Sequence, residues 1–260
     1  MDLLEESQMT RAEEKAHWWI RTRFLYLNQV TCKALRRFTR ISILEMGCGT
    51  AQNLAYLRED FQQTKQIDHL HGIEPGLSAA QGQYPWLLPH DSVLRSVADF
   101  DAASHKTGFH LVISMDVLEH IHDDTAALKE WITMLAPNGI VFITVPAFTW
   151  LWSRHDVILG HKRRYTIKSL KALAENAGLK PIKTGYIFGY TLPLVYLIRR
   201  ILPRFYTEKE TQASNLQKTH ALANIILTMF GWLEYLLGGN PFFGSSVFGV
   251  FEKEPLRADP

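Results

Sequence analysis

The feature that most constrains the fold is an alternation of short apolar runs with helix-like segments. The apolar runs are short and rich in β-branched residues, as in strands that helices cover on both faces. The expected strands are residues 41–46, 69–74, 92–97, 110–115, 139–145, 181–188 and 245–252. The expected helices are residues 10–38, 51–60, 75–84, 123–135 and 167–178. The alternation predicts an α/β fold with a doubly wound parallel sheet.

Local signals place the ends of two of these helices. An aspartate at the start of residues 123–135 is a suitable N-cap, and the following Pro-Asn-Gly, residues 137–139, predicts the end of that helix. Gly178 predicts the end of the helix over residues 167–178.

Composition limits the class of protein. The chain has 260 residues, of which 47% are hydrophobic, and a formal net charge of +2, which does not favour a nucleic-acid partner. Its two cysteines, Cys32 and Cys48, lack metal-ligand spacing and indicate a reducing compartment. The acidic, polar N-terminus is unlike a signal peptide, and no apolar run approaches the roughly 18 residues of a spanning helix. We therefore expect a cytoplasmic protein, with a peripheral position at the inner face of a membrane as an option.

A candidate ligand site follows the first strands. The first strand ends in EMGCGT, whose Gly47 and Gly49 permit a tight turn and close approach of the backbone to a ligand. A dinucleotide fingerprint would require glycine at position 52, which is Gln52. Glu74, at the end of the second strand, can accept hydrogen bonds from both hydroxyls of a ribose. Asp99, after the third strand, is a candidate for an adenine amine, although a helix cap or a solvated loop would also explain it.

Four ordered motifs carry a resemblance to a known family. ILEMGCGTAQNLAYL, HGIEPG, HLVISMDVLEHIHDD and LAPNGIVFITVPA resemble motifs of class I S-adenosylmethionine-dependent methyltransferases over about residues 10–189, resuming at the last strand. The resemblance implies a seven-stranded Rossmann-like sheet whose last strand is antiparallel, and bound S-adenosylmethionine. The cofactor positions that it implies are Glu45, Gly47, Cys48, Gly49, Glu74, Pro75, Asp99, Met115 and Asp116. Acidic residues suit this cofactor because it carries a sulfonium and an ammonium group but no phosphate.

The connection WSRHDVILGHKRRY, residues 152–165, is unusually rich in ionisable and aromatic residues. It follows the fifth strand and, with LEHIHDD after the fourth, shares the sheet edge expected to hold the methyl group. Candidates for a general base are His155, His120, His161 and Tyr165. Each of them could instead have only a structural role.

The same connection carries candidates for acceptor binding. Trp152 is one, and Arg163 and Arg164 suit a phosphate or carboxylate of an acceptor, although a solvated basic turn is the alternative. A metal site at His155, Asp156 and His161 is weakly indicated, and no metal is expected.

The chain is expected to divide into four parts. Residues 1–40 are expected to form an N-terminal helical lid, because RAEEKAHWWIRTRF resembles a lid segment of one branch of the family. The resemblance implies that Trp18, Trp19 and Arg23 contact the acceptor. Packing of the tryptophans onto the sheet is the alternative. Residues 41–189 form the cofactor-binding core, residues 190–240 a helical insertion, and residues 241–260 the last strand and tail.

The insertion contains a helix with an unusual pattern. In residues 221–237, Asn224, Thr228, Gly231 and Glu234 form one narrow polar or small stripe, and the rest is apolar. Three explanations remain open. The helix could be buried in a cap over the site, lie at a membrane interface with the help of Arg199, Arg200 and Arg204, or form a homodimer contact.

Together these patterns predict an S-adenosylmethionine-dependent methyltransferase. We expect a small acceptor, hydrophobic or lipid-linked, that could carry a phosphate or carboxylate. A protein that binds the cofactor but acts only as a partner or scaffold is the alternative, against which Glu74 and the ionisable connection argue. Gln52 argues against a dinucleotide oxidoreductase. No nucleic-acid partner is expected.

Overall fold

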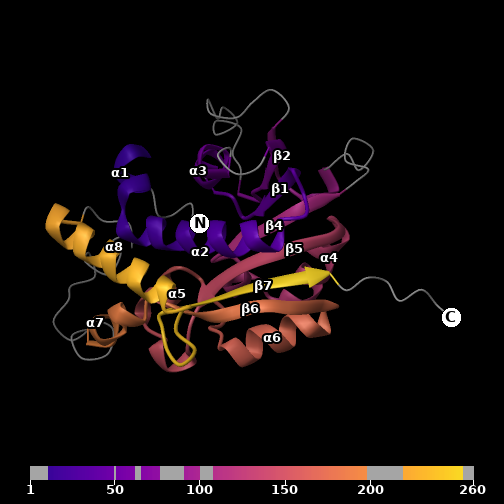
Figure 1. Cartoon of the computed structure of the whole chain (residues 1–260). Coiled ribbons are helices and arrows are strands. Elements are labelled where there is room, and N and C mark those ends of the chain that lie inside the picture. The colour runs from indigo at the N-terminus through magenta and orange to yellow at the C-terminus, as the bar shows by residue number, and fades with distance from the viewer. Residues whose placement is uncertain are drawn as a thin grey trace.

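The centre of the molecule is a seven-stranded sheet (Figure 1). The computed structural model describes residues 11–49, 51–61, 66–76, 91–99, 108–197 and 219–253. The strands are β1 (Arg40–Met46), β2 (Gln66–Ile73), β3 (Ser92–Leu94), β4 (Phe109–Met115), β5 (Leu135–Pro146), β6 (Leu179–Ile187) and β7 (Ser246–Lys253). Their order is β3-β2-β1-β4-β5-β7-β6, and only β7 is antiparallel to its neighbours. The predicted α/β class and the mostly parallel seven-stranded sheet are confirmed.

Helices cover both faces of this sheet (Figure 1). They are α1 (Arg11–Ala16), α2 (Trp18–Ala34), α3 (Gln52–Phe61), α4 (Asp124–Thr133), α5 (Arg154–Ile158), α6 (Ile167–Asn176), α7 (Leu192–Tyr196) and α8 (Ala221–Leu236). Because successive strand residues point to opposite faces, Ile140 and Phe142 of β5 join the core beneath α2 and α3. The intervening Val141 and Ile143 join the core beneath α4 and α6. The sheet is therefore buried on both faces, as its continuous apolar strands require.

Two predicted boundaries change in the structure. The expected helix over residues 10–38 breaks at His17, whose extended backbone (ψ 132°) separates α1 from α2, and α2 ends at Ala34. The third strand is shorter than residues 92–97, because Val97–Asp99 form a 3₁₀ turn. The helix expected from residue 75 falls mainly outside the described residues.

The Pro-Asn-Gly segment does not end a helix, which corrects the prediction. Asp123 caps α4 as expected, since its carboxylate accepts a hydrogen bond from the Ala126 amide at 2.9 Å. However, α4 stops at Thr133, and residues 137–139 lie within β5. The pairing of β4 with β5 shifts there, and Asn138 adopts a positive φ of 59°. The segment thus forms a bulge, which tolerates a proline and a left-handed residue inside a strand.

The polar stripe of α8 faces the protein. The Asn224 side chain accepts a hydrogen bond from the Trp18 amide at 2.7 Å and donates one to the Ala16 carbonyl at 2.9 Å. The Glu234 carboxylate accepts hydrogen bonds from the amides of Phe188 and Gly189, at 2.8 and 2.7 Å. A side chain at Gly231 would collide with Thr22 of α2. The stripe is therefore the contact face, where α8 crosses α2 (Figure 1).

Most of the large apolar side chains of α8 point away from the core, whereas Tyr235 packs against it. The exposed ones are Leu222, Ile225, Ile226, Met229, Phe230, Trp232, Leu233 and Leu236, followed by Leu237. Burial of this helix in a cap over the site, one of the three explanations, is therefore wrong for these side chains. Among the described residues, no helix combines the length and apolar character needed to cross a membrane.

Candidate functional site

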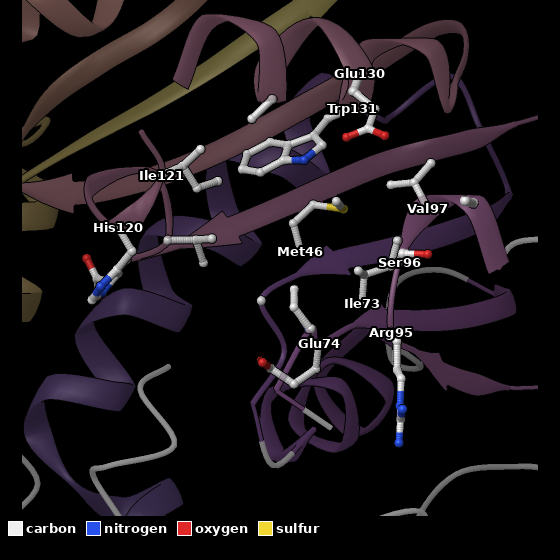
Figure 2. A pocket seen from close by; sticks show the side chains of 16 residues that line it. Met46, Ile73, Glu74, Arg95, Ser96, Val97, His120, Ile121, Glu130 and Trp131 are labelled. Atoms are coloured by element: carbon white, nitrogen blue, oxygen red, sulfur yellow. The ribbon is translucent and has the colours of Figure 1, made fainter. Parts of the chain in front are cut away.

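A cavity of about 680 Å³ opens at the carboxyl ends of β1, β2 and β4 (Figure 2). This is the edge where parallel α/β sheets bind ligands. Its lining residues are Met46, Gly47, Ile73, Glu74, Pro75, Arg95, Ser96, Val97, Ala98, Asp116, Val117, His120, Ile121, Ala127, Glu130 and Trp131. Apolar side chains thus form most of the wall, and a few polar groups interrupt it.

The glycine turn after β1 forms one wall of the cavity. Gly47 and Gly49 both have positive φ angles, 66° and 54°. The amides of Gly47 and Cys48 donate to the Ile73 carbonyl at 2.7 and 3.1 Å, which ties the turn to β2. A side chain at Gly47 would collide with Val117. Glycine is thus required here by both conformation and space.

Glu74 holds this turn in place and faces the cavity. Its two carboxylate oxygens accept hydrogen bonds from the amides of Gly49 and Gly76, at 2.8 and 2.9 Å. Each oxygen keeps a further lone pair, which can accept a hydrogen bond from a vicinal diol. Nearby Ile73 and Val97 offer apolar surface for a planar ring. The residues present therefore fit the ribose and adenine of S-adenosylmethionine.

The other predicted cofactor residues divide into two groups. Pro75 and Asp116 also line the cavity, whereas Glu45, Cys48, Gly49, Asp99 and Met115 do not. The Asp99 carboxylate accepts hydrogen bonds from the amide and hydroxyl of Ser96, at 3.0 and 2.9 Å. Asp99 thus caps a turn whose residues 96–98 line the cavity in its place, as its alternative reading anticipated.

Glu45 is a buried acid behind the glycine turn. One of its oxygens accepts a hydrogen bond from the Asn53 side chain at 2.8 Å, and the other has no partner among the described residues. Burial raises the pKa of Glu45 to about 7, although the Asn53 hydrogen bond opposes the shift. Glu45 can therefore change charge near neutral pH.

Asp116, at the end of β4, links the site to the N-terminal helix. Its φ of 56° is left-handed, and its amide donates to the Thr144 carbonyl at 2.9 Å. Its carboxylate forms an ion pair with Arg23 of α2 at 2.9 Å. The Arg23 guanidinium also lies 4.1 Å from the centre of the Trp19 ring. Arg23 thus holds α2 against the site, and its expected role in acceptor binding stays a prediction.

The paired tryptophans pack onto the core. Trp18 meets Phe188 edge-on, with ring centres 5.6 Å apart, and Trp19 stacks on Phe188 at 6.4 Å. Neither tryptophan lines the cavity, and Trp152 does not line it either. The packing alternative therefore describes Trp18 and Trp19 better than acceptor binding does.

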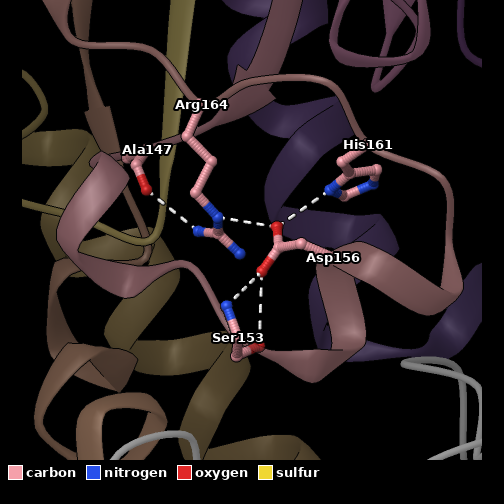
Figure 3. A network of polar contacts seen from close by, with 5 residues as sticks. All are labelled: Ala147, Ser153, Asp156, His161 and Arg164. Atoms are coloured by element: carbon pink, nitrogen blue, oxygen red, sulfur yellow. Dashed lines mark hydrogen bonds and ion pairs between the residues drawn. The ribbon is translucent and has the colours of Figure 1, made fainter.

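The connection over residues 152–165 is built around Asp156 (Figure 3). Asp156 is fully buried and lies on α5, a helix that the sequence did not predict. Its carboxylate accepts hydrogen bonds from the amide and hydroxyl of Ser153, at 2.8 and 3.2 Å, and from Arg164 at 2.7 Å. His161 Nδ1 lies 2.9 Å from the same carboxylate. Burial alone would raise the pKa of Asp156, but the bonds from His161 and Arg164 hold it well below its usual range.

Both arginines have partners within the protein, and their predicted role at the acceptor stays a prediction. Arg164 is buried, and it also donates to the Ala147 carbonyl at 2.9 Å. Arg163 pairs with Asp124 at 2.7 Å and donates to the His122 carbonyl. Through these contacts both guanidinium groups order the connection.

Tyr165 is not placed to act as a base. It is buried, and its hydroxyl donates to the Asp124 carboxylate at 2.8 Å. Burial, followed by this hydrogen bond, raises its pKa. Tyr165 therefore stays protonated and anchors the connection to α4.

Two of the predicted histidines meet beside the cavity. His120 lines it, and the ring of His161 lies 4.7 Å from that of His120. The Lys162 amide donates to the Glu119 carbonyl at 2.6 Å, which ties the connection to the segment after β4. The expected adjacency of these two segments is confirmed. His155 lies half-buried on α5 and does not line the cavity.

Sequence reasoning missed the importance of Glu119. It is fully buried, and neither carboxylate oxygen has a hydrogen-bond partner in another described residue. Burial and the neighbouring Asp116 raise the pKa of Glu119 well above its usual range. The available signal was an acid that follows the apolar Val117 and Leu118 and directly precedes His120.

Comparison with known proteins gives a family match. Residues 19–184 match the model of a family described as a methyltransferase domain. A ubiquinone biosynthesis O-methyltransferase from Parvibaculum lavamentivorans is 24% identical in an alignment of 188 residues, and the match covers 61% of this chain and 69% of that protein.

Solved structures give the same fold. Haemonchus contortus phosphoethanolamine N-methyltransferase 2, bound to S-adenosyl-L-methionine, has a TM-score of 0.52 at 17% identity, over 97% of this chain and 59% of that one. A plantazolicin methyltransferase bound to S-adenosylhomocysteine has a TM-score of 0.54 at 15% identity, over 90% of this chain and 86% of that one. At these identities the structures share the architecture alone.

Proposed function

The chain belongs to the methyltransferase domain family, and we propose that it methylates an oxygen atom of a hydrophobic, membrane-associated small molecule. It is an S-adenosylmethionine-dependent enzyme with a class I fold. The nature of the acceptor and the roles of individual residues are the proposal.

We assign the cavity to the cofactor. Glu74 accepts hydrogen bonds from the ribose hydroxyls, and the adenine lies between Ile73 and Val97. Asp116 and Glu45 supply negative charge toward the sulfonium and the ammonium group. Support comes from the free lone pairs of Glu74 and from the three acids, which suit a cation.

The acceptor oxygen lies at the end of the cavity marked by His120, Glu119 and His161. Methyl transfer to a hydroxyl requires loss of its proton and exclusion of water. His120 lines the cavity, and His161 is held against it by Asp156. The 24% identical relative is named an O-methyltransferase, which favours oxygen as the acceptor atom.

The proposal of a hydrophobic acceptor rests on one observation, the outward face of α8. Met229 and Leu237 are 66% and 76% exposed, and seven further apolar side chains of α8 are among the exposed large hydrophobic residues around them. Large apolar patches on a surface mark contacts with membranes or proteins. Arg199, Arg200 and Arg204 lie outside the described residues; in the sequence they precede α8 and supply positive charge of the kind found in segments that bind anionic lipid. Contact with a membrane would bring the enzyme to a lipid-like substrate.

The experiment combines vesicle flotation with a search for the product. Wild-type protein is expected to float with vesicles of phosphatidylglycerol and phosphatidylcholine, and the double variant Met229→Glu/Leu237→Glu to stay in solution. Ile182→Glu, on the exposed face of β6, is the matched control and should float. Labelled S-adenosylmethionine added to membrane extract should then label a lipid-soluble product.

Three outcomes separate the alternatives. Labelling of water-soluble compounds alone would contradict the hydrophobic acceptor. A wild-type dimer in light scattering that the double variant abolishes, without flotation, would assign the α8 face to a homodimer. Cofactor binding without any labelled product would favour the scaffold.

A further inference from the structure

Glu119, His120 and His161 bring three possible metal ligands together. One carboxylate oxygen and one nitrogen from each imidazole lie within 4.8 Å of one another. Glu119 and His120 lie on the 3₁₀ turn after β4, and His161 lies on the connection after α5. The backbone hydrogen bond from Lys162 to Glu119 fixes the two segments against each other at 2.6 Å. The cluster is therefore held by the fold and not by a single loop.

The Glu119 carboxylate needs a partner that the described residues do not supply. It is fully buried, and no other described residue donates to either oxygen. Buried carboxylates are nearly always paired, hydrogen-bonded or bound to a metal. The nearby cation, Arg23, is already paired with Asp116 and stacked on Trp19. A bound cation would satisfy Glu119.

His161 is oriented like a metal-binding histidine. Its Nδ1 faces Asp156 at 2.9 Å, which leaves Nε2 for another partner (Figure 3). Arg164 and Ser153 fix that carboxylate in turn. A carboxylate behind the distal nitrogen is the usual arrangement for histidines that bind metals, because it sets the tautomer and the ring orientation.

We propose that Glu119, His120 and His161 bind one divalent transition-metal ion at the edge of the cavity. Two imidazoles and one carboxylate suit Zn²⁺, Mn²⁺, Fe²⁺ or Co²⁺ and leave coordination positions open. This replaces our expectation that the protein has no metal. It also differs from the weaker alternative of His155, Asp156 and His161, because the Asp156 carboxylate already serves Arg164 and Ser153.

A catalytic role for this ion extends the proposed function. Only this role rests on the proposed function, because it assumes that the acceptor atom is an oxygen. With the acceptor oxygen at an open position, the ion lowers the pKa of the hydroxyl, as it does for bound water. The proton leaves to solvent, and the oxygen–methyl bond forms as the methyl–sulfur bond breaks, which yields S-adenosylhomocysteine. The imidazoles then serve as ligands and not as bases.

Metal binding can be measured without acceptor or cofactor. The whole protein is stripped with a chelator and titrated with Co²⁺, followed by visible absorption, and with Zn²⁺ by calorimetry. One ion should bind per chain. Glu119→Gln, His120→Ala and His161→Ala should each weaken binding by about 10-fold or more, and Asp156→Asn by about 10- to 100-fold. His122→Ala removes an exposed neighbouring histidine and should leave binding unchanged.

The controls keep the result interpretable. Circular dichroism and S-adenosylhomocysteine affinity show whether each variant is folded. The proposal is overturned if the wild-type protein binds no ion, or if folded variants of the three ligands bind it like His122→Ala. S-adenosylhomocysteine binding by the metal-free protein would then still uphold the methyltransferase function, so the two failures are distinguishable.

Discussion

Substitution of Glu234 tests how α8 is attached to the core. Its carboxylate accepts hydrogen bonds from two consecutive amides, those of Phe188 and Gly189, at the turn after β6. Phe188 has a φ of 63°, so the turn is in a left-handed conformation that a non-glycine residue adopts only when it is held there. Glu234→Gln keeps the shape of the side chain but leaves one oxygen to serve two amides.

The expected loss of stability follows from these bonds. A hydrogen bond to a charged group contributes about 1.5–3 kcal/mol. Burial raises the pKa of Glu234, although the two amides oppose the shift, so desolvation of the charge offsets part of the gain. We therefore expect Glu234→Gln to lower the free energy of unfolding by about 1.5 kcal/mol. For a chain of this size, that corresponds to a decrease in Tm of roughly 3–6 °C.

Two measurements check this value. Thermal denaturation followed by circular dichroism gives the change in Tm, and hydrogen exchange at Phe188 and Gly189 shows whether the loss is local. Glu175→Gln, an exposed site on α6, removes the same charge and should change stability by less than about 0.5 kcal/mol. Equal Tm values for the two variants, with unchanged exchange at both amides, would refute the anchoring role of Glu234.

Two further predictions concern the cofactor. Glu74→Ala should weaken S-adenosylhomocysteine binding by about 1.5–3 kcal/mol, or roughly 10- to 150-fold, in calorimetry, with Glu175→Ala as control; a change below about twofold would remove Glu74 from the site. Burial raises the pKa of Glu45 to about 7, from an unfolded value near 4.5. Its contribution to the stability of the fold is therefore complete below about pH 4.5, where Glu45 is neutral, and is lost as the pH rises through about 7. The cationic cofactor favours the ionised form, so S-adenosylmethionine should bind more tightly at pH 8 than at pH 6 and release a proton at pH 6. Calorimetry in two buffers of different ionisation enthalpy detects that proton, and its presence in Glu45→Gln would contradict the assignment.

The sequence predicted the parts of the fold that depend on local pattern. The first strand was expected at residues 41–46 and is Arg40–Met46, because a run of apolar residues stopped by glycine has few other solutions. The cavity was expected beside Gly47 and Glu74, since strand ends of a parallel sheet share one edge.

The sequence pattern could not predict contacts between residues that are distant in the chain. Arg163 and Arg164 were interpreted as free cations because their partners, Asp124 and Asp156, are recognisable only when α4 and α5 are in place. Glu119 gave no periodic signal.

The stripe of α8 was found, but the sequence did not decide which face is buried. The stripe meets backbone amides, at the N-terminus of α2 for Asn224 and at the turn after β6 for Glu234. Polar side chains are the better match to such a partner. The usual rule that a surface helix packs its apolar face against the core therefore fails for α8.

The position of β7 has a consequence for how the chain is made. β7 lies between β5 and β6 yet leaves the ribosome after both of them, and after the whole insertion. Until it arrives, β6 has no strand to pair with, and β5 presents an open edge to other chains. The sheet therefore closes late and through contacts that are distant in sequence, which is a slow class of folding event. Nascent chains that stall within the insertion are for that reason the forms most exposed to aggregation and to chaperones.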